Sequence, residues 1–193
     1  MVNGRAVAPS DMIRDQHFET DGSARGVHCM TLDPQSFRKT MSRFASGVTV
    51  VTARNATGAP VGLTVSAFAS LSLDPPMILV CLNKGCHDLA AFQTGPFAVS
   101  VLAEDQEALS RRFAGPRAER FAGLESEAGS NGCPVLPDSL AVVECRTESV
   151  FPGGDHDIII GVVTSLRCHP DKRPLIYFAG GYNRLMDRSS AAG

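Results

Sequence analysis

The chain has 193 residues, 44% of them apolar and 20% charged, with a formal net charge of −2. This composition is typical of a single globular domain with a full core. The weak negative charge argues against a basic surface for nucleic acid, and the absence of Trp with only two Tyr leaves few rings for base stacking. No apolar run approaches the roughly 20 residues that a membrane span needs. We therefore expect a cytoplasmic protein that binds neither nucleic acid nor membrane.

The six cysteines are too few and too scattered for a disulfide scaffold in a chain of this length, and we expect them to be reduced. Cys81 and Cys86 are not accompanied by a C-x-x-C pair or a second cluster, so no metal site is expected. Cys81, Cys145 and Cys168 lie in apolar strand patterns and are predicted to be small buried side chains.

The two ends of the chain differ in composition from its middle. Residues 1–30 are polar and show neither helical nor strand periodicity, which predicts a flexible N-terminal arm. A short flexible tail is expected at 188–193. The segment between them, 31–187, is predicted to form the one folded domain.

The domain is expected to open with a helix. Asp33 followed by Pro34 is a pair typical of a helix N-terminus. Phe37, Met41 and Phe44 then recur at helical spacing. The pattern predicts an amphipathic helix that ends near residue 47.

The rest of the domain is expected to be rich in strands. Further helices are expected at 86–93 and 104–113, the second acidic at its start and basic at its end as the helix dipole favours, with a short turn at 117–121 and a loop at 128–138. The predicted strands are 48–53, 61–73, 77–82, 96–102, 141–150, 157–167 and 175–178. Neighbouring antiparallel strands with few helices predict a mainly β fold, a closed or split barrel.

Two motifs indicate a binding site. Residues 60–76 read PVGLTVSAFASLSLDPP, where small and hydroxyl residues alternate with apolar ones at the strand period. Such an edge presents hydroxyls and backbone N–H groups that can hold an anion without a glycine-rich nucleotide loop, and neither G-x-G-x-x-G nor G-x-x-x-x-G-K-[ST] occurs in the chain. Residues 153–157 read GGDHD, a tight turn carrying a titratable ring.

Five segments in order resemble the short-chain flavin reductase family. Its members are FMN-binding split-barrel reductases that supply reduced flavin to a partner monooxygenase. The segments are FASGVTVVTA (44–53), VGLTVSAFASLSLDPPMILVCLN (61–83), RFAG (112–115), GGDHDIIIGVV (153–163) and PLIYFAGGY (174–182). The resemblance implies the FMN-binding split β-barrel fold and a homodimer.

The resemblance also implies which residues meet the flavin. Gly62, Thr64 and Ser66 are first choices among these, although from the residues alone they are equally ordinary strand residues. Many relatives have a second Ser where this chain has Ala67, which keeps only its backbone N–H. The implied flavin-binding residues are Gly62, Leu63, Thr64, Ser66, Ala67, Leu82, Asn83, Lys84, His87, Asp88 and Phe113.

Several of these residues have a simpler interpretation. The segment 83–88 precedes a predicted helix, whose N-terminus attracts phosphate, and Lys84 with His87 would add positive charge. Relatives often have hydroxyls or Arg there, and Lys84 is at least as well explained as a solvated side chain. Phe113 has core packing as its default role.

A second group is implied to lie beside the nicotinamide. His156 is the one catalytic residue expected there, orienting the nicotinamide or relaying a proton, although a surface-loop His is the simpler interpretation. Gly181 and Tyr182 would close the same pocket, and Tyr182 is also explained as a half-buried amphipathic residue.

The function implied is an NAD(P)H:flavin oxidoreductase acting on FMN or FAD, with NADH favoured over NADPH. It would pass reduced flavin by diffusion to a transient partner monooxygenase. One alternative is a non-catalytic flavin carrier of the same fold. A second is a single-component FMN oxidase of pyridoxamine-phosphate oxidase type, against which the chain lacks a basic cluster for the substrate phosphate.

Overall fold

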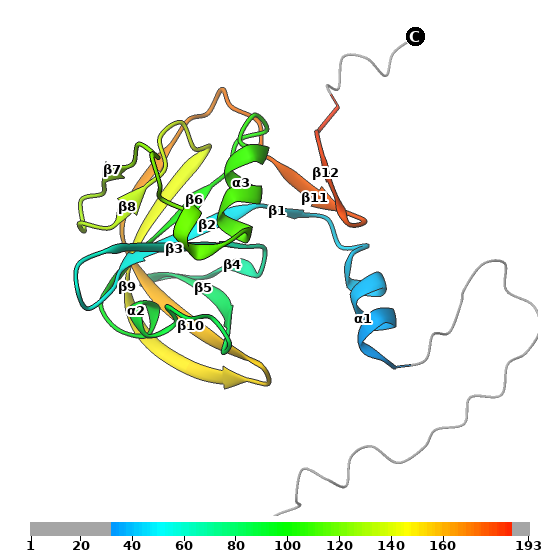
Figure 1. Cartoon of the computed structure of the whole chain (residues 1–193), viewed down its shortest axis with the longest axis horizontal. Helices are drawn as coiled ribbons and strands as arrows, with labels where there is room; N and C mark the ends of the chain where they lie inside the picture. Colours follow the sequence, from blue (N-terminus) through cyan, green and yellow to red (C-terminus); the bar gives the residue numbers. More distant parts are fainter. Residues whose placement is uncertain (1–31, 187–193) are drawn as a thin grey trace, which may run out of the picture.

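The computed structural model describes residues 32–186 (Figure 1), so the predicted arm and tail lie outside the described residues. A seven-stranded sheet dominates the molecule, in the order β3-β2-β6-β9-β10-β5-β4 with every neighbouring pair antiparallel. Its strands are β2 (Thr49–Arg54), β3 (Pro60–Val65), β4 (Phe68–Leu73), β5 (Pro76–Asn83), β6 (Pro96–Val101), β9 (Ala141–Gly153) and β10 (His156–Cys168).

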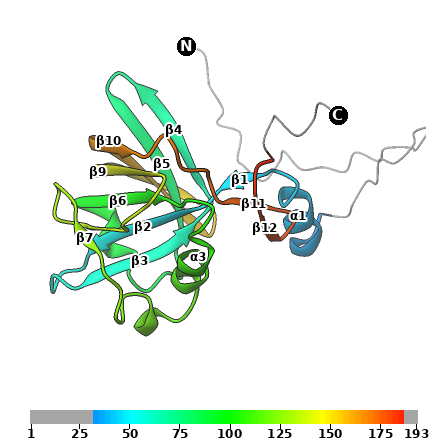
Figure 2. The same ribbon diagram turned by 90° about the horizontal axis from the view of Figure 1, so that it is seen from above.

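The sheet is a split barrel because its two edge strands are consecutive in the chain. β3 pairs with β2 at one edge and β4 pairs with β5 at the other, and only Ser66 and Ala67 separate them. The two edge strands are therefore joined at this corner and spread apart away from it, as the open fan in Figure 2 shows. The mainly β fold is confirmed, but the single strand expected at 61–73 is wrong. The chain turns at Ser66, whose carbonyl accepts the Phe68 amide at 3.0 Å.

The longest hairpin joins β9 and β10 and carries the GGDHD motif at its tip. Gly153 pairs with His156 across a two-residue turn, and Gly154 has a φ of +66°. A positive φ at the first turn residue is what a type II′ hairpin requires, and glycine adopts it without strain.

Helix α1 (Pro34–Met41) has the predicted N-cap but ends earlier than expected. The Asp33 carboxylate accepts the amides of Gln35 and Ser36 at 2.8 and 3.0 Å. The helix ends at Met41 because Ser42 turns the chain: its hydroxyl bonds the Lys39 carbonyl, and its carbonyl accepts the Ala179 amide at 2.8 Å. The prediction of a helix to residue 47 was wrong.

A small sheet connects this helix to the end of the described chain. It has the order β1-β11-β12, with β1 (Ser46–Gly47), β11 (Ile176–Phe178) and β12 (Gly181–Asn183). Figure 2 shows it set to one side of the barrel together with α1. None of the residues of α1 is buried by the other residues of 32–186.

Three helices and a short sheet complete the described chain. Helix α2 (Ala90–Gln93) is shorter than the predicted 86–93, whereas α3 (Glu107–Ala114) and the 3₁₀ turn η2 (Arg117–Glu119) lie close to the predicted positions. Glu107 in the first turn and Arg111 and Arg112 in the last confirm the expected charge order of α3. The segment predicted as a loop at 128–138 borders β7 (Glu127–Ala128) and contains β8 (Pro134–Val135).

Two main clusters form the core. The larger fills the barrel between β2, β5, β6, β9 and β10, and the second lies where α3 covers the outside of β2 and β3. The five described cysteines are free. Cys145 is buried as predicted, which raises its pKa to about 12, but Cys168 is exposed because it ends β10 beyond the core.

Candidate functional site

Two adjoining cavities meet at the corner between β3 and β4. The larger has a volume of about 660 Å³ and the smaller about 230 Å³. Ser66 and Tyr177 line both, so the two form one continuous recess. The wall of the larger cavity is mostly apolar, and includes Phe37, Met41, Phe44, Ala67 and Cys81. The space is wide enough for a flat aromatic ligand.

The corner itself presents backbone donors. The carbonyls of Ser66 and Ala67 accept the amides of Phe68 and Cys81, each at 3.0 Å. Neither the Ser66 nor the Ala67 amide donates a hydrogen bond to any residue within 32–186, and both side chains are exposed. Both residues line the larger cavity. Adjacent amides without an acceptor among the described residues can bind the carbonyl and nitrogen edge of a planar ring.

The smaller cavity is bounded by a hydrogen-bonded group from three elements. Thr64 on β3 donates its hydroxyl to the Ser110 carbonyl on α3 at 2.7 Å. The Ser110 hydroxyl lies 2.7 Å from the Tyr182 hydroxyl on β12. Arg111 lies over the Tyr182 ring with its guanidinium carbon 4.9 Å from the centroid. Thr64 and Tyr182 were predicted for the site, whereas Ser110 and Arg111 were not.

Four of the predicted flavin residues lie behind the cavity wall. Gly62 is buried, and a Cβ there would lie 3.0 Å from a ring carbon of Phe113. Phe113 and Leu82 are fully buried in the two core clusters, and Leu63 packs against the larger one. Gly62 therefore permits close packing of α3 on β3, and none of the four lines either cavity.

The segment that follows β5 bonds to the chain itself. Asn83 accepts the Gly85 amide on its side-chain oxygen at 2.7 Å. Lys84 donates its amine to the Gly154 carbonyl at 2.6 Å and lies 3.9 Å from the Asp157 carboxylate. The helix start expected at residue 86 was wrong, because residues 84–89 form turns and α2 begins at Ala90. A four-residue helix supplies no strong dipole to a phosphate.

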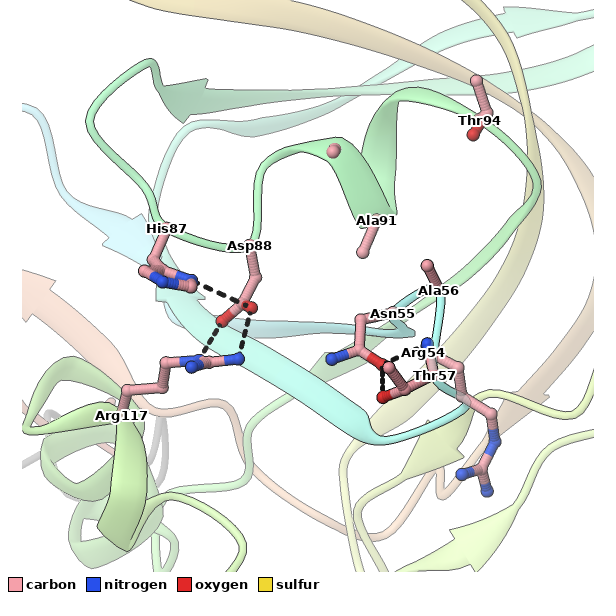
Figure 3. A pocket seen from close by; sticks show the side chains of 10 residues that line it. Arg54, Asn55, Ala56, Thr57, His87, Asp88, Ala91, Thr94 and Arg117 are labelled. Carbon is pink, nitrogen blue, oxygen red and sulfur yellow. Dashed lines mark hydrogen bonds and ion pairs between the residues drawn. The ribbon is translucent and has the colours of Figure 1, made fainter.

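His87 and Asp88 line a separate cavity of about 410 Å³, shown in Figure 3. The cavity lies between α2 and the turn after β2, where Asn55 and Thr57 project toward it. Arg117 forms a bidentate ion pair with Asp88, with nitrogen to oxygen distances of 2.7 and 2.8 Å. The pair fixes η2 against the loop after β5 and largely neutralises Asp88.

His156 pairs with Asn83 in the ladder between β10 and β5, whereas Ile158 pairs with Cys81. Paired residues and residues two apart point to the same side of a sheet, so His156 lies on the face that carries Cys81 into the larger cavity. It lines neither cavity itself. Its Nδ1 lies 2.8 Å from the Asp155 carboxylate, and this hydrogen bond lowers the pKa of Asp155.

The sequence interpretation missed three residues that shape these cavities: Ser110, Arg117 and Tyr177. Tyr177 lies within the quoted PLIYFAGGY segment, and its place in that segment beside Phe178 was the available signal. Ser110 is a single serine in a helix, and Arg117 has its partner 29 residues away. Neither of these two had a local signal.

Within residues 32–186, no group of three or more His, Cys, Asp or Glu side chains is placed to hold a metal ion. In the same residues, no helix combines the length and apolar character required to cross a bilayer.

Comparison with known proteins gives matches over most of the chain. The sequence model described as "Flavin reductase like domain" matches residues 41–186. A probable flavin reductase of Rhizobium meliloti is 43% identical over 78% of this chain, which spans only about half (48%) of that relative. The reductase subunit of a flavin-dependent monooxygenase of Rhodococcus jostii is 40% identical, with 82% of each protein covered.

The fold also matches that of a solved structure. The NADH:FAD oxidoreductase of Streptomyces globisporus, determined with NAD and FAD fragments, superposes with a TM-score of 0.77 and 30% identity. The alignment covers 83% of this chain and 99% of that one.

Proposed function

The chain belongs to the flavin reductase-like domain family, and on this basis we propose that it transfers hydride from NADH to FMN or FAD and supplies the reduced flavin to a partner monooxygenase. The flavin, when bound, supplies the ring that accepts the hydride. The protein has to bind the two planar molecules, align them and exclude water between them, and no nucleophilic side chain is required.

The observation that carries the proposal is the corner at Ser66 and Ala67: both residues line the larger cavity, and neither amide has an acceptor within residues 32–186. Reduction places negative charge on the pyrimidine side of a flavin, and fixed N–H donors stabilise such charge as it develops. The Ser66 hydroxyl adds a third donor. The missing hydroxyl at Ala67 leaves its amide in place, so the corner keeps its function.

The other residues divide into lining and supporting groups. Thr64 and Tyr182 bound the smaller cavity, where Gly181 precedes Tyr182 on β12. The supporting group holds β3 and β5 in place behind the cavity wall and consists of Gly62, Leu63, Leu82 and Phe113.

We place the flavin phosphate at the loop after β5, since Lys84 contributes a cationic amine there. The same loop carries Asn83 and His87. Asp88 acts through Arg117, which it holds.

His156 orients the nicotinamide in this proposal. Its support is the strand register, which sets the imidazole on the face of β5 and β10 that leads to the larger cavity. Asp155 accepts a hydrogen bond from one ring nitrogen and so fixes the ring orientation. Unchanged KM for NADH and unchanged turnover in His156→Ala would remove His156 from this role.

We further propose a cytoplasmic homodimer. Phe37, Met41 and Phe44 expose 58%, 52% and 76% of their surface on α1 and the turn after it, at the mouth of the larger cavity. A second copy would cover these side chains and shield the flavin from solvent. Reduced nicotinamide is an intracellular reductant, which supports the cytoplasm as the place of the reaction.

The function is tested by a steady-state assay of NADH and NADPH oxidation with FMN, FAD and riboflavin. We expect oxidation of the nicotinamide that depends on added flavin, faster with NADH than with NADPH. A protein that binds flavin tightly but never oxidises either nicotinamide would be a carrier, and the oxidoreductase proposal would be wrong.

A further inference from the structure

The hydroxyls of Ser110 and Tyr182 meet at the wall of the smaller cavity. We propose that Ser110 is a positioning residue: its hydroxyl fixes the ring of Tyr182, so that this ring forms a rigid wall against which the nicotinamide is held beside Ser66. The inference rests on the proposed function, because it assigns a role at that same site.

The geometry gives Ser110 a double connection. Its side chain is fully buried, and its hydroxyl lies 2.7 Å from that of Tyr182. Its carbonyl accepts the Thr64 hydroxyl at 2.7 Å. One residue of α3 therefore joins the edge strand β3 to β12, and Ser110, Thr64 and Tyr182 all line the smaller cavity.

The Tyr182 ring packs against the second core cluster and has three further contacts. Its hydroxyl meets Ser110, one face meets the guanidinium of Arg111 at 4.9 Å, and the Tyr177 ring packs against it at 5.4 Å and 68°. Contacts of the two latter types leave an aromatic ring free to slide, whereas a hydrogen bond from a buried hydroxyl fixes its end.

The strand that carries Tyr182 has few backbone bonds of its own, although the chain just before β11 is tied to the barrel by the bond from the Leu175 amide to the Leu102 carbonyl. β12 has three residues and pairs with β11 alone, and β11 pairs in turn with the two-residue β1. No strand of this small sheet belongs to the ladder of the barrel. The contact with Ser110 therefore ties the β11–β12 hairpin to α3, which packs on the barrel, and sets the width of the smaller cavity.

The chain allows this inference to be tested with an intrinsic probe. It contains no Trp and two Tyr, and both Tyr residues line the smaller cavity. In a Tyr177→Phe background, tyrosine fluorescence and the tyrosine band of the near-ultraviolet circular dichroism, which lies at longer wavelength than the phenylalanine bands, report on Tyr182 alone. Adding Ser110→Ala is expected to reduce the dichroism of Tyr182 toward that of a mobile ring, without any ligand present.

The kinetic test compares Ser110→Ala, Tyr182→Phe and the double variant in the otherwise unchanged chain. Loss of one such hydrogen bond is expected to raise the KM for NADH by roughly threefold to tenfold, with a smaller change in KM for FMN. Because both variants remove the same contact, the double variant should match either single variant. Ser139→Ala is the matched control, since Ser139 is also buried and donates to the Leu136 carbonyl at 3.0 Å, away from the cavity.

Two results would overturn the inference. One is a Ser110→Ala protein whose dichroism and KM for NADH equal those of Ser139→Ala. The other is a double variant in which the two single effects multiply, because the residues would then act independently. A wild-type protein that does not oxidise NADH would instead refute the proposed function, whereas an active wild type with an unaffected Ser110→Ala refutes the role of Ser110 alone.

Discussion

At the residue scale, the buried carboxylate of Glu144 has a structural role and lines neither of the two cavities at the β3–β4 corner. It lies on β9 with 2% of its surface exposed, and its Oε2 accepts the Ser130 hydroxyl and the Asn131 amide at 2.8 Å each. Burial alone would raise the pKa of Glu144, but these donors and the more distant Arg167 outweigh it, so the pKa is lowered below its usual 4.5.

A lowered pKa makes stability depend on pH. Glu144 stabilises the folded chain above the pKa of the unfolded state, and this contribution is lost as the pH falls through the folded value. We expect Glu144→Gln to lower the free energy of unfolding at pH 7 by about 1.5–3 kcal/mol, the range for hydrogen bonds to a charged group. The difference from wild type should shrink as the pH falls below the usual carboxyl value of 4.5, as measured by urea unfolding at several pH values.

Glu148→Gln is the control for this prediction, because Glu148 is exposed and pairs only with Arg146 at the surface. It should change stability by less than about 1 kcal/mol at any pH. Parallel pH profiles for wild type and Glu144→Gln would contradict the assignment.

Single-residue patterns in the sequence predicted part of the site. The alternating pattern predicted Thr64 and Ser66, and the family resemblance added Ala67. All three line the cavities. The hydrogen bond from Lys84 to the Gly154 carbonyl could not be predicted from such patterns, because 70 residues separate the two. The same holds for Ser110, whose partner Tyr182 lies 72 residues away.

At the element scale, Gly161 of β10 lies unusually close to side chains of β6 and β9. A Cβ on Gly161 would lie 2.5 Å from the ring of Phe97 on β6 and 2.9 Å from the Cβ of Cys145 on β9. The ladder between β9 and β10 shifts register beside this glycine. The close approach lets the sheet curl around the Phe97 ring, which fills the core.

We therefore expect Gly161→Ala to destabilise the chain by about 1–3 kcal/mol through overpacking. Adding Phe97→Leu should restore part of the loss, because it removes the ring atoms that the methyl group meets. Thermal unfolding of the two single variants and the double variant measures this coupling.

Gly47→Ala serves as its control, since no atom lies within 4 Å of a Cβ at Gly47. Equal effects at positions 47 and 161 would show that the close approach carries no cost.

The sequence predicted the boundaries of helices and strands correctly where neighbouring residues determine them. The Asp33 cap of α1 and the turn before β5 were predicted correctly. The corner at Ser66 and Ala67 was not, because the alternating pattern continues through it and only the closure of the barrel divides the strand. The end of α1 at Met41 depends on a hydrogen bond from Ala179, which no local window contains.

At the scale of the whole molecule, the exposed apolar side chains of α1 and the following turn predict association. We expect a mass of twice the chain mass of 20.4 kDa in size-exclusion chromatography with light scattering. Phe44→Glu should shift the protein toward the monomer, because Phe44 exposes 76% of its surface there. Leu166→Glu, at a 67% exposed position on β10 that lines neither cavity, should leave the mass unchanged. A monomeric wild type would contradict the dimer.

The most direct measurement is a titration of FMN and FAD into ¹⁵N-labelled protein, followed by amide nuclear magnetic resonance. The account predicts that the Ser66 and Ala67 amide signals shift strongly and saturably toward values typical of hydrogen-bonded amides, while that of Ser139 stays in place. Saturable flavin binding that leaves the Ser66 and Ala67 amides unchanged would show that the ring lies elsewhere, and the central claim would be wrong.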